Sequence, residues 1–194
     1  MRRSKKKLMR LICRDCLKEG NFALAAGGTS DYFIDLRLIS VSGKGASLIG
    51  KVLYHQTKNT DFQAIGGLQV GAVPLVTATV AHYWNRGSGL REGFWVRPEK
   101  KDHGTEKQVE GKLLFNSRVI IVEDVCTTGG SASRAVQVVQ DMGNEVVLVL
   151  ALVDREQGAR EKFREMRIPF ESVFTARQLR ENARVFGYST VGAE

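Results

Sequence analysis

Cysteine, proline and histidine are scarce in this chain of 194 residues, which holds three of each. Three cysteines cannot all pair, and Cys13 and Cys16 lack a second Cys or His pair at the spacing of a metal site. The sequence therefore argues against a disulfide framework and against a structural zinc site. We expect Cys13, Cys16 and Cys126 to be free thiols.

Long linkers and membrane spans are also missing from the sequence. Only three prolines and no low-complexity tract occur, so we expect one domain over residues 1–194. No apolar run reaches the roughly 18 residues of a membrane span. No apolar run of signal-peptide length follows the basic N-terminus. We expect a soluble, cytoplasmic protein with no membrane partner.

Basic residues outnumber acidic ones, and the net charge is +8. This excess favours anionic partners but does not choose between a phosphorylated metabolite and nucleic acid. Half of the first fourteen residues are basic: Arg2, Arg3, Lys5, Lys6, Lys7, Arg10 and Arg14. No aromatic residue lies among them, so a solvated helix face is favoured over a nucleic-acid-binding surface. Nucleic acid is not expected as a partner.

Hydrophobic periodicity indicates alternating helices and strands. Helices are predicted at about residues 5–19, 42–58, 73–85, 131–142 and 156–166. Strands are predicted at residues 22–24, 31–36, 63–66, 94–97, 118–123 and 145–153. The last two strands are almost wholly apolar, which is typical of parallel strands covered on both faces. We predict a doubly wound α/β fold whose ligand binds at the carboxyl ends of the strands.

The segment VIIVEDVCTTGGS at residues 119–131 carries the clearest chemical signal. A buried strand ends in Glu123 and Asp124, and a loop of small hydroxyl and glycine residues then opens a helix. Backbone amides at a helix start bind phosphate, and glycine allows its close approach. The residues expected along the phosphate are Val125, Cys126, Thr127, Thr128, Gly129, Gly130 and Ser131.

The two carboxylates select the class of ligand. Neither a Walker loop nor a dinucleotide fingerprint is present at this strand exit. Carboxylates repel a polyphosphate but accept hydrogen bonds from vicinal hydroxyls, so the ligand should be a sugar diol with a terminal phosphate. The segment resembles the motif of type I phosphoribosyltransferases, in which two acids hold the ribose of phosphoribosyl pyrophosphate (PRPP) and the loop holds its 5-phosphate. The plainer alternative is a strand exit with polar caps.

Three further segments are similar, in the same chain order, to those of orotate phosphoribosyltransferases. FWVRPEKKDHG at residues 94–104 resembles the mobile catalytic loop, LAAGGTSDYFID at residues 24–35 the base-site segment, and VDREQG at residues 153–158 the Asp-Arg-x-x-Gly segment. Alone, each has a plainer explanation as a solvated loop, core packing or an ion pair. The resemblance implies a small N-terminal hood over residues 1–36 and an α/β core over residues 37–175.

The resemblance also implies a reaction. The family transfers ribose 5-phosphate from PRPP to orotate, which gives orotidine 5′-monophosphate and pyrophosphate in UMP biosynthesis. By this resemblance, Arg97, Lys101 and His103 would hold the pyrophosphate group of PRPP. Glu123 and Asp124 would contact its ribose hydroxyls. Lys101, His103 and Asp124 would be the catalytic residues.

Further implications concern the base, the cofactor and the assembly. Orotate would contact Phe33, Thr127 and Arg155, with the arginine facing the carboxylate of the base. Mg²⁺ would be held mainly through PRPP, with no direct protein ligand expected. The family resemblance further implies a homodimer in which the loop at residues 97–108 is shared across the interface.

The sequence departs from the family at three positions. Ala25, Gly71 and Pro98 stand where some members carry lysine, and Lys100 is a replacement for the last of these. Each lost ammonium removes contacts worth about 1.5–3 kcal/mol if nothing replaces it. Gly71 lies in GGLQVGAVP at residues 66–74, which resembles the family's pyrophosphate loop.

These departures leave two alternatives open. One is a phosphoribosyltransferase for another base, such as a purine or uracil. The other is a non-catalytic regulator that senses PRPP and binds nucleic acid. Arg155 favours orotate because an arginine facing a neutral base would have no carboxylate to pair with. Lys101 and His103 favour an enzyme because they lie in a loop with leaving-group chemistry.

Overall fold

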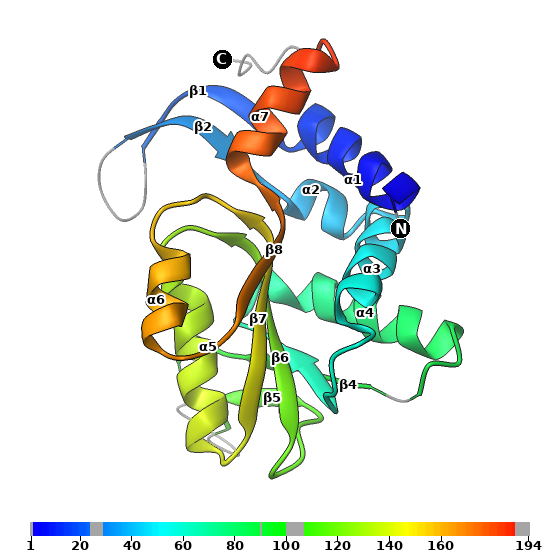
Figure 1. The fold of residues 1–194 in the computed structure, drawn as a ribbon, viewed down its shortest axis with the longest axis vertical. Coiled ribbons are helices and arrows are strands. Elements are labelled where there is room, and N and C mark those ends of the chain that lie inside the picture. The colour runs from blue at the N-terminus through cyan, green and yellow to red at the C-terminus, as the bar shows by residue number, and fades with distance from the viewer. Residues whose placement is uncertain (1, 24–28, 90, 100–106, 189–194) are drawn as a thin grey trace.

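The computed structural model describes residues 2–23, 29–89, 91–99 and 107–188. Its centre is a six-stranded sheet of order β5-β4-β3-β6-β7-β8 (Figure 1). The strands are β3 (Ala64–Gly66), β4 (Glu92–Val96), β5 (Val109–Gly111), β6 (Arg118–Cys126), β7 (Glu145–Asp154) and β8 (Phe170–Thr175). Neighbouring strands are parallel except for β4 and β5. The predicted α/β fold is confirmed.

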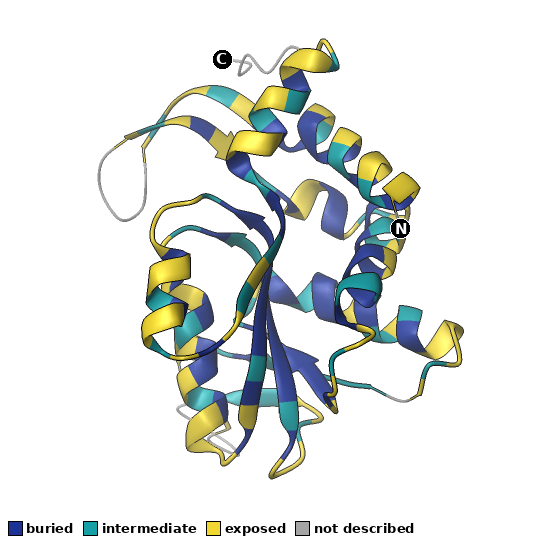
Figure 2. Ribbon diagram, in the orientation of Figure 1, coloured by how far each residue is buried: buried dark blue, intermediate teal, exposed yellow. Residues whose placement is uncertain are grey.

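Helices cover both faces of this sheet. In Figure 1, α3 (Gly43–Thr57) and α4 (Ala72–Asn85) lie on one side, and α5 (Gly130–Asp141) and α6 (Ala159–Glu165) on the other. Side chains of β6 alternate between the two sides, with Ile120 and Val122 in one apolar cluster and Val119 and Ile121 in the other. The dark blue strands of Figure 2 show this double burial, which explains the apolar run of the strand.

A second, two-stranded sheet lies apart from the first. It consists of β1 (Leu17–Ala23) and β2 (Thr29–Ile34), which pair antiparallel, and α2 (Arg37–Ser40) follows it. Beside this hairpin pack α1 (Arg2–Asp15) and α7 (Ala176–Val185) (Figure 1). Leu8 and Ile12 of α1 share an apolar cluster with the α3 and α4 side of the large sheet. The division into a hood (residues 1–36) and a core (residues 37–175) stays a prediction.

The predicted helix at residues 5–19 was wrong at both ends. The helix spans Arg2–Asp15, and Leu17 already belongs to β1, where it pairs with Ile34 of β2. The sequence favours a longer helix because Cys16 continues the apolar face of Leu8 and Ile12, and Gly20 is typical of a residue just past a helix end. Pairing with β2 overrides that local pattern, as tertiary contacts commonly do.

Four elements had not been predicted: α2, β5, β8 and α7. β5 is a strand of three residues with a single apolar side chain, Val109, so period-two alternation is not visible in it. α7 begins with a capping box in which Thr175 and Gln178 bond each other's backbone amides, a signal present in the sequence but not used. The three cysteines are free, as predicted, and the structure shows that they are also buried. No helix in the described ranges could span a membrane.

Candidate active site

The loop between β6 and α5 forms a phosphate-sized hollow at the carboxyl end of the sheet. A cavity of about 140 Å³ is lined by Glu123, Val125 and the run of residues 126–131. Gly129 is the N-cap of α5 with a φ of 81°, and no side-chain hydrogen bond is made from this cap position. A Cβ at Gly129 would lie 2.9 Å from the Phe163 ring, so glycine is required there. Amides at such a helix start can bind an anion.

Cys126 contributes no negative charge to this loop. Its thiol is buried, and burial together with the charges of Glu123 and Asp154 raises its pKa to about 12. A neutral thiol does not repel a phosphate dianion. The predicted members of the loop, including Thr127, Thr128, Gly130 and Ser131, all line the same cavity.

Glu123 and Asp124 lie between this cavity and a larger one. Glu123 is only 6% exposed, and its Oε2 has no hydrogen-bond partner among the described residues. Burial raises the pKa of Glu123 well above its usual value, and the charge of Asp124 adds to the rise. Asp124 is half-buried and accepts a 2.7 Å hydrogen bond at Oδ1 from the amide of Val125. Burial thus disfavours the charged form of Glu123, whereas Asp124 is the more exposed carboxyl of the pair.

The larger cavity, of about 370 Å³, adjoins the first through Glu123, Val125 and Ser131. Its wall combines β2 and α2 residues with the loop after β3: Phe33, Ile34, Asp35, Leu36, Arg37, Leu68, Gln69, Val70, Gly71 and Asp124. Phe33, predicted for the base, thus lies in one cavity with both acids. A hollow of about 530 Å³ elsewhere, between residues 107–111 and the end of α5, contains none of the predicted acids or phosphate-loop residues.

The loop of residues 67–71 runs against the carboxylate pair. A Cβ at Gly67 would lie 2.2 Å from the carbonyl oxygen of Val122, and a Cβ at Gly71 would lie 2.6 Å from the carboxylate of Asp124. Glycine permits this close approach at both positions. The lysine that some family members carry at the position of Gly71 has no room here unless Asp124 moves.

Arg97 stands at the base of the predicted catalytic loop. Its amide donates to the carbonyl of Gln108 at 2.8 Å, which continues the β4–β5 pairing beyond Val96. The amide of Gln69 donates to the carbonyl of Val96 at 2.9 Å, so Arg97 follows directly on a contact with the 67–71 loop. Its Nε is buried without a hydrogen-bond partner in the described chain. Lys101 and His103 lie outside the described residues.

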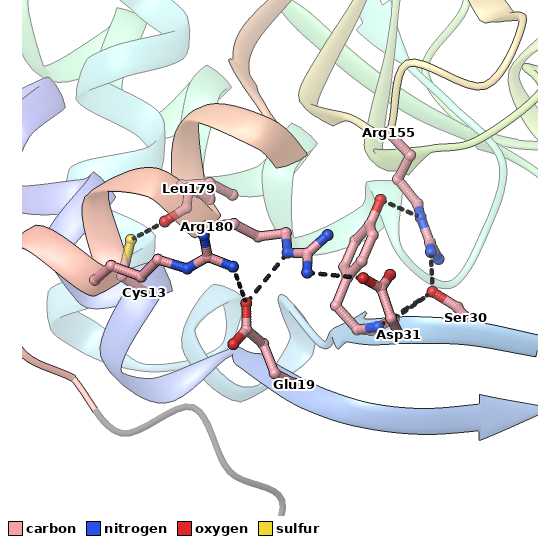
Figure 3. Close-up of polar contacts among 9 residues, drawn as sticks. Cys13, Glu19, Ser30, Asp31, Arg155, Leu179 and Arg180 are labelled. Atoms are coloured by element: carbon pink, nitrogen blue, oxygen red, sulfur yellow. Dashed lines mark hydrogen bonds and ion pairs between the residues drawn. The ribbon is translucent and has the colours of Figure 1, made fainter.

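Arg155 follows β7 and is engaged by the hairpin. Its amide donates to the carbonyl of Cys126 at 2.8 Å, which places it beside the phosphate loop. Its side chain donates from Nη2 to Ser30 at 2.8 Å and from Nε to the hydroxyl of Tyr32 at 3.1 Å (Figure 3). It lines a cavity of about 480 Å³ rather than the one with Phe33. Thr127 lines the phosphate cavity.

Two polar residues of the wall were not singled out from the sequence. Arg37 donates from its amide and Nε to Asp35 Oδ1 and from Nη2 to Oδ2, so the pair is held at the rim of the cavity. Gln69 lies on the wall that faces Asp124. Gln69 belongs to the segment that resembled the family's pyrophosphate loop, and that resemblance was the available signal. Arg37 lies two residues after the segment that resembled the base site.

The glycine-rich helix start, the carboxylate pair before it and the mostly parallel sheet are the features of a type I phosphoribosyltransferase. No family model matches the chain. It is 40% identical over 177 residues to the orotate phosphoribosyltransferase of Bradyrhizobium diazoefficiens, which covers 89% of this chain and 94% of that protein. It is 42% identical over 155 residues to the orotate phosphoribosyltransferase of Streptomyces avermitilis, with 80% and 85% covered.

A solved structure agrees with these relatives. The orotate phosphoribosyltransferase of Mycobacterium tuberculosis in complex with PRPP superimposes with a TM-score of 0.76 at 32% identity, over 91% of this chain and 98% of that one. The chain belongs to the orotate phosphoribosyltransferase family.

Proposed function

We propose that this protein transfers ribose 5-phosphate from PRPP to orotate. The observation that carries the proposal is the buried Glu123, whose unpartnered Oε2 lies between the phosphate hollow and the larger cavity. An orphaned buried carboxyl oxygen is costly unless a ligand hydroxyl satisfies it. A ribose diol at Glu123 and Asp124, with its 5-phosphate on residues 126–131, meets that need and points the anomeric carbon into the larger cavity.

The chemical step follows from the same placement. As pyrophosphate leaves, positive charge builds on the ribose ring, and the carboxylate of Asp124 stabilises it. Arg97, Lys101 and His103 hold the departing anion, since Arg97 lies next to the 67–71 loop that borders the site. Phe33, Thr127 and Arg155 hold the base. Closing the site excludes water, which would otherwise compete with orotate for the activated sugar.

Mg²⁺ fits this site as a cation carried by PRPP. Among the described residues no group of three His, Cys, Asp or Glu side chains is arranged to hold a metal. The oxygen ligands that Mg²⁺ prefers would come mainly from the substrate, with Asp124 beside them. Bound there, Mg²⁺ would neutralise charge on the pyrophosphate.

The setting of the enzyme is proposed from the family. We place it in the cytoplasm as a homodimer, in which residues 97–108 of each chain reach the site of the partner. The β4–β5 pairing supports a defined stem for this loop, because it ends at Val96 and Val109.

A panel of bases tests the proposed function. The protein is incubated with PRPP, Mg²⁺ and one base at a time, and base consumption and pyrophosphate release are measured. Orotate should be consumed. Consumption of adenine, hypoxanthine or uracil but not of orotate would show that the enzyme uses another base. PRPP binding without any turnover would favour a regulator.

Replacing Arg155 by alanine should raise the KM for orotate while leaving the KM for PRPP nearly unchanged. Only the base carries a carboxylate for this guanidinium, and a lost charge-assisted pair is worth about 1.5–3 kcal/mol, or roughly 10- to 150-fold. Steady-state kinetics with each substrate varied in turn provide the measurement. Equal weakening of both substrates would assign Arg155 a structural role.

A further inference from the structure

Two arginines lie against the ring of Tyr32 in β2. The guanidinium carbon of Arg155 is 4.4 Å from the ring centroid, and that of Arg180 is 4.9 Å away. Arg155 follows β7, whereas Arg180 comes from α7, so this contact joins the large sheet, the hairpin and the C-terminal helix (Figure 3). Planar guanidinium groups stack on aromatic rings and thereby fix each other's orientation.

Arg180 also holds both strands of the hairpin. Its Nε donates to Glu19 of β1 at 3.2 Å and its Nη2 donates to Asp31 of β2 at 2.8 Å (Figure 3). The side chain is 26% exposed, much less than that of Arg184 one turn later on the same helix, which is 70% exposed. A surface ion pair alone stabilises a fold little, but one guanidinium that bridges two acids and a ring restricts all three.

The hairpin in turn fixes Arg155. The Oγ of Ser30 and the hydroxyl of Tyr32 accept the two side-chain hydrogen bonds of Arg155. Ser30 is itself held, because its Oγ donates to the carbonyl of Tyr32 at 2.7 Å. The direction of the Arg155 guanidinium therefore depends on where β2 lies, and β2 is tied to α7 through Arg180.

We propose that Arg180 is a positioning residue for the base site: it holds Tyr32 and the hairpin so that Arg155 is oriented for the carboxylate of orotate. This inference rests on the proposed function, in which Arg155 recognises that carboxylate. Arg180 touches no reacting atom. Its effect passes through Tyr32 and Ser30 to Arg155, and it should change the affinity for the base without changing that for PRPP.

Alanine substitutions at Arg180 and Arg184 provide a matched comparison. Both remove one positive charge from α7 and one contact to Glu19, which lies 3.7 Å from Arg184. Arg180→Ala should raise the KM for orotate about fivefold or more and leave the KM for PRPP and kcat within about twofold. Arg184→Ala should change none of the three. Arg180→Lys should restore little, because an ammonium cannot bridge both acids and stack on the ring.

A double-mutant cycle with Arg155→Ala tests the route of the effect. If Arg180 acts through Arg155, Arg180→Ala should add almost nothing to the orotate KM once Arg155 is gone. Tyr32→Phe keeps the ring but removes the hydroxyl that accepts a hydrogen bond from Arg155, so it should also raise the KM for orotate. If Arg180→Ala does not fold, the Tyr32→Phe and Arg180→Lys variants test the same proposal.

Several outcomes would overturn the proposal: additive effects in the cycle, a parallel rise of both KM values, or equal effects of Arg180→Ala and Arg184→Ala. Failure of the function itself is recognised separately, because the unsubstituted protein would then consume no orotate. An active unsubstituted protein with an unaffected Arg180→Ala variant would overturn only the role of Arg180.

Discussion

Lys101→Ala should lower kcat by roughly 10²- to 10³-fold, the range for removing one preorganised transition-state donor. The lysine matches the loop lysine of the family and would meet charge that develops on pyrophosphate as the glycosidic bond to it breaks. Binding of PRPP in the ground state should change less than kcat. Steady-state and single-turnover rates with PRPP and orotate measure the effect.

Lys107→Ala is the control for this substitution. Lys107 belongs to the same loop, is exposed, and lines the hollow beside β5 rather than either cavity of the candidate site. Both variants lose one positive charge, so a general attraction of PRPP would weaken alike in the two. Lys107→Ala should be nearly silent. Equal kcat values for the two variants would contradict the proposed catalytic role of the loop.

Asp124→Asn should lower kcat by roughly 10²-fold, because the amide keeps the shape of the side chain but removes the charge proposed to stabilise the electron-poor ribose. Glu123→Gln should cost less than about tenfold. Burial and the charge of Asp124 raise the pKa of Glu123 and so disfavour its charged form, which makes the neutral amide of glutamine a mild replacement.

Measuring kcat and the KM for PRPP on both variants separates the two acids. The inequality depends on Asp124, the more exposed acid, being the one that stabilises the ribose in the transition state. A larger loss of kcat for Glu123→Gln than for Asp124→Asn would assign that role to Glu123 instead. A rise in the KM for PRPP with an unchanged kcat in Asp124→Asn would limit Asp124 to ground-state binding.

The strand-loop-helix unit that carries the proposed phosphate loop could be predicted from the sequence because its signals are local. Glu123, Asp124 and Gly129 follow one another on a single strand-loop-helix unit, and the apolar run before them marks a buried strand. The structure adds why glycine is needed there, since a side chain at Gly129 would meet Phe163 of α6. That contact joins segments whose proximity no periodicity reveals.

The surroundings of the base site could not be predicted in the same way. Arg180 lies 149 positions from Asp31 and 161 from Glu19, and it comes from a helix that had not been recognised. Arg155 is predicted to face the base, but its bonds to Ser30 and Tyr32 depend on a hairpin whose first strand begins within the predicted helix at residues 5–19. Partners so distant in sequence are fixed only by the complete fold.

The bonds of Arg155 have a consequence for the choice among bases. Ser30 and Tyr32 engage Nε and Nη2 of the guanidinium, and an aromatic ring lies against it. Held in this direction, the guanidinium can offer its remaining hydrogens to a carboxylate, and such a charge-assisted hydrogen bond is roughly twice as strong as a neutral one. The carbonyl of uracil would offer no such gain. Discrimination against neutral pyrimidines would then arise from a donor whose direction is set by the fold, in addition to any long-range attraction of orotate.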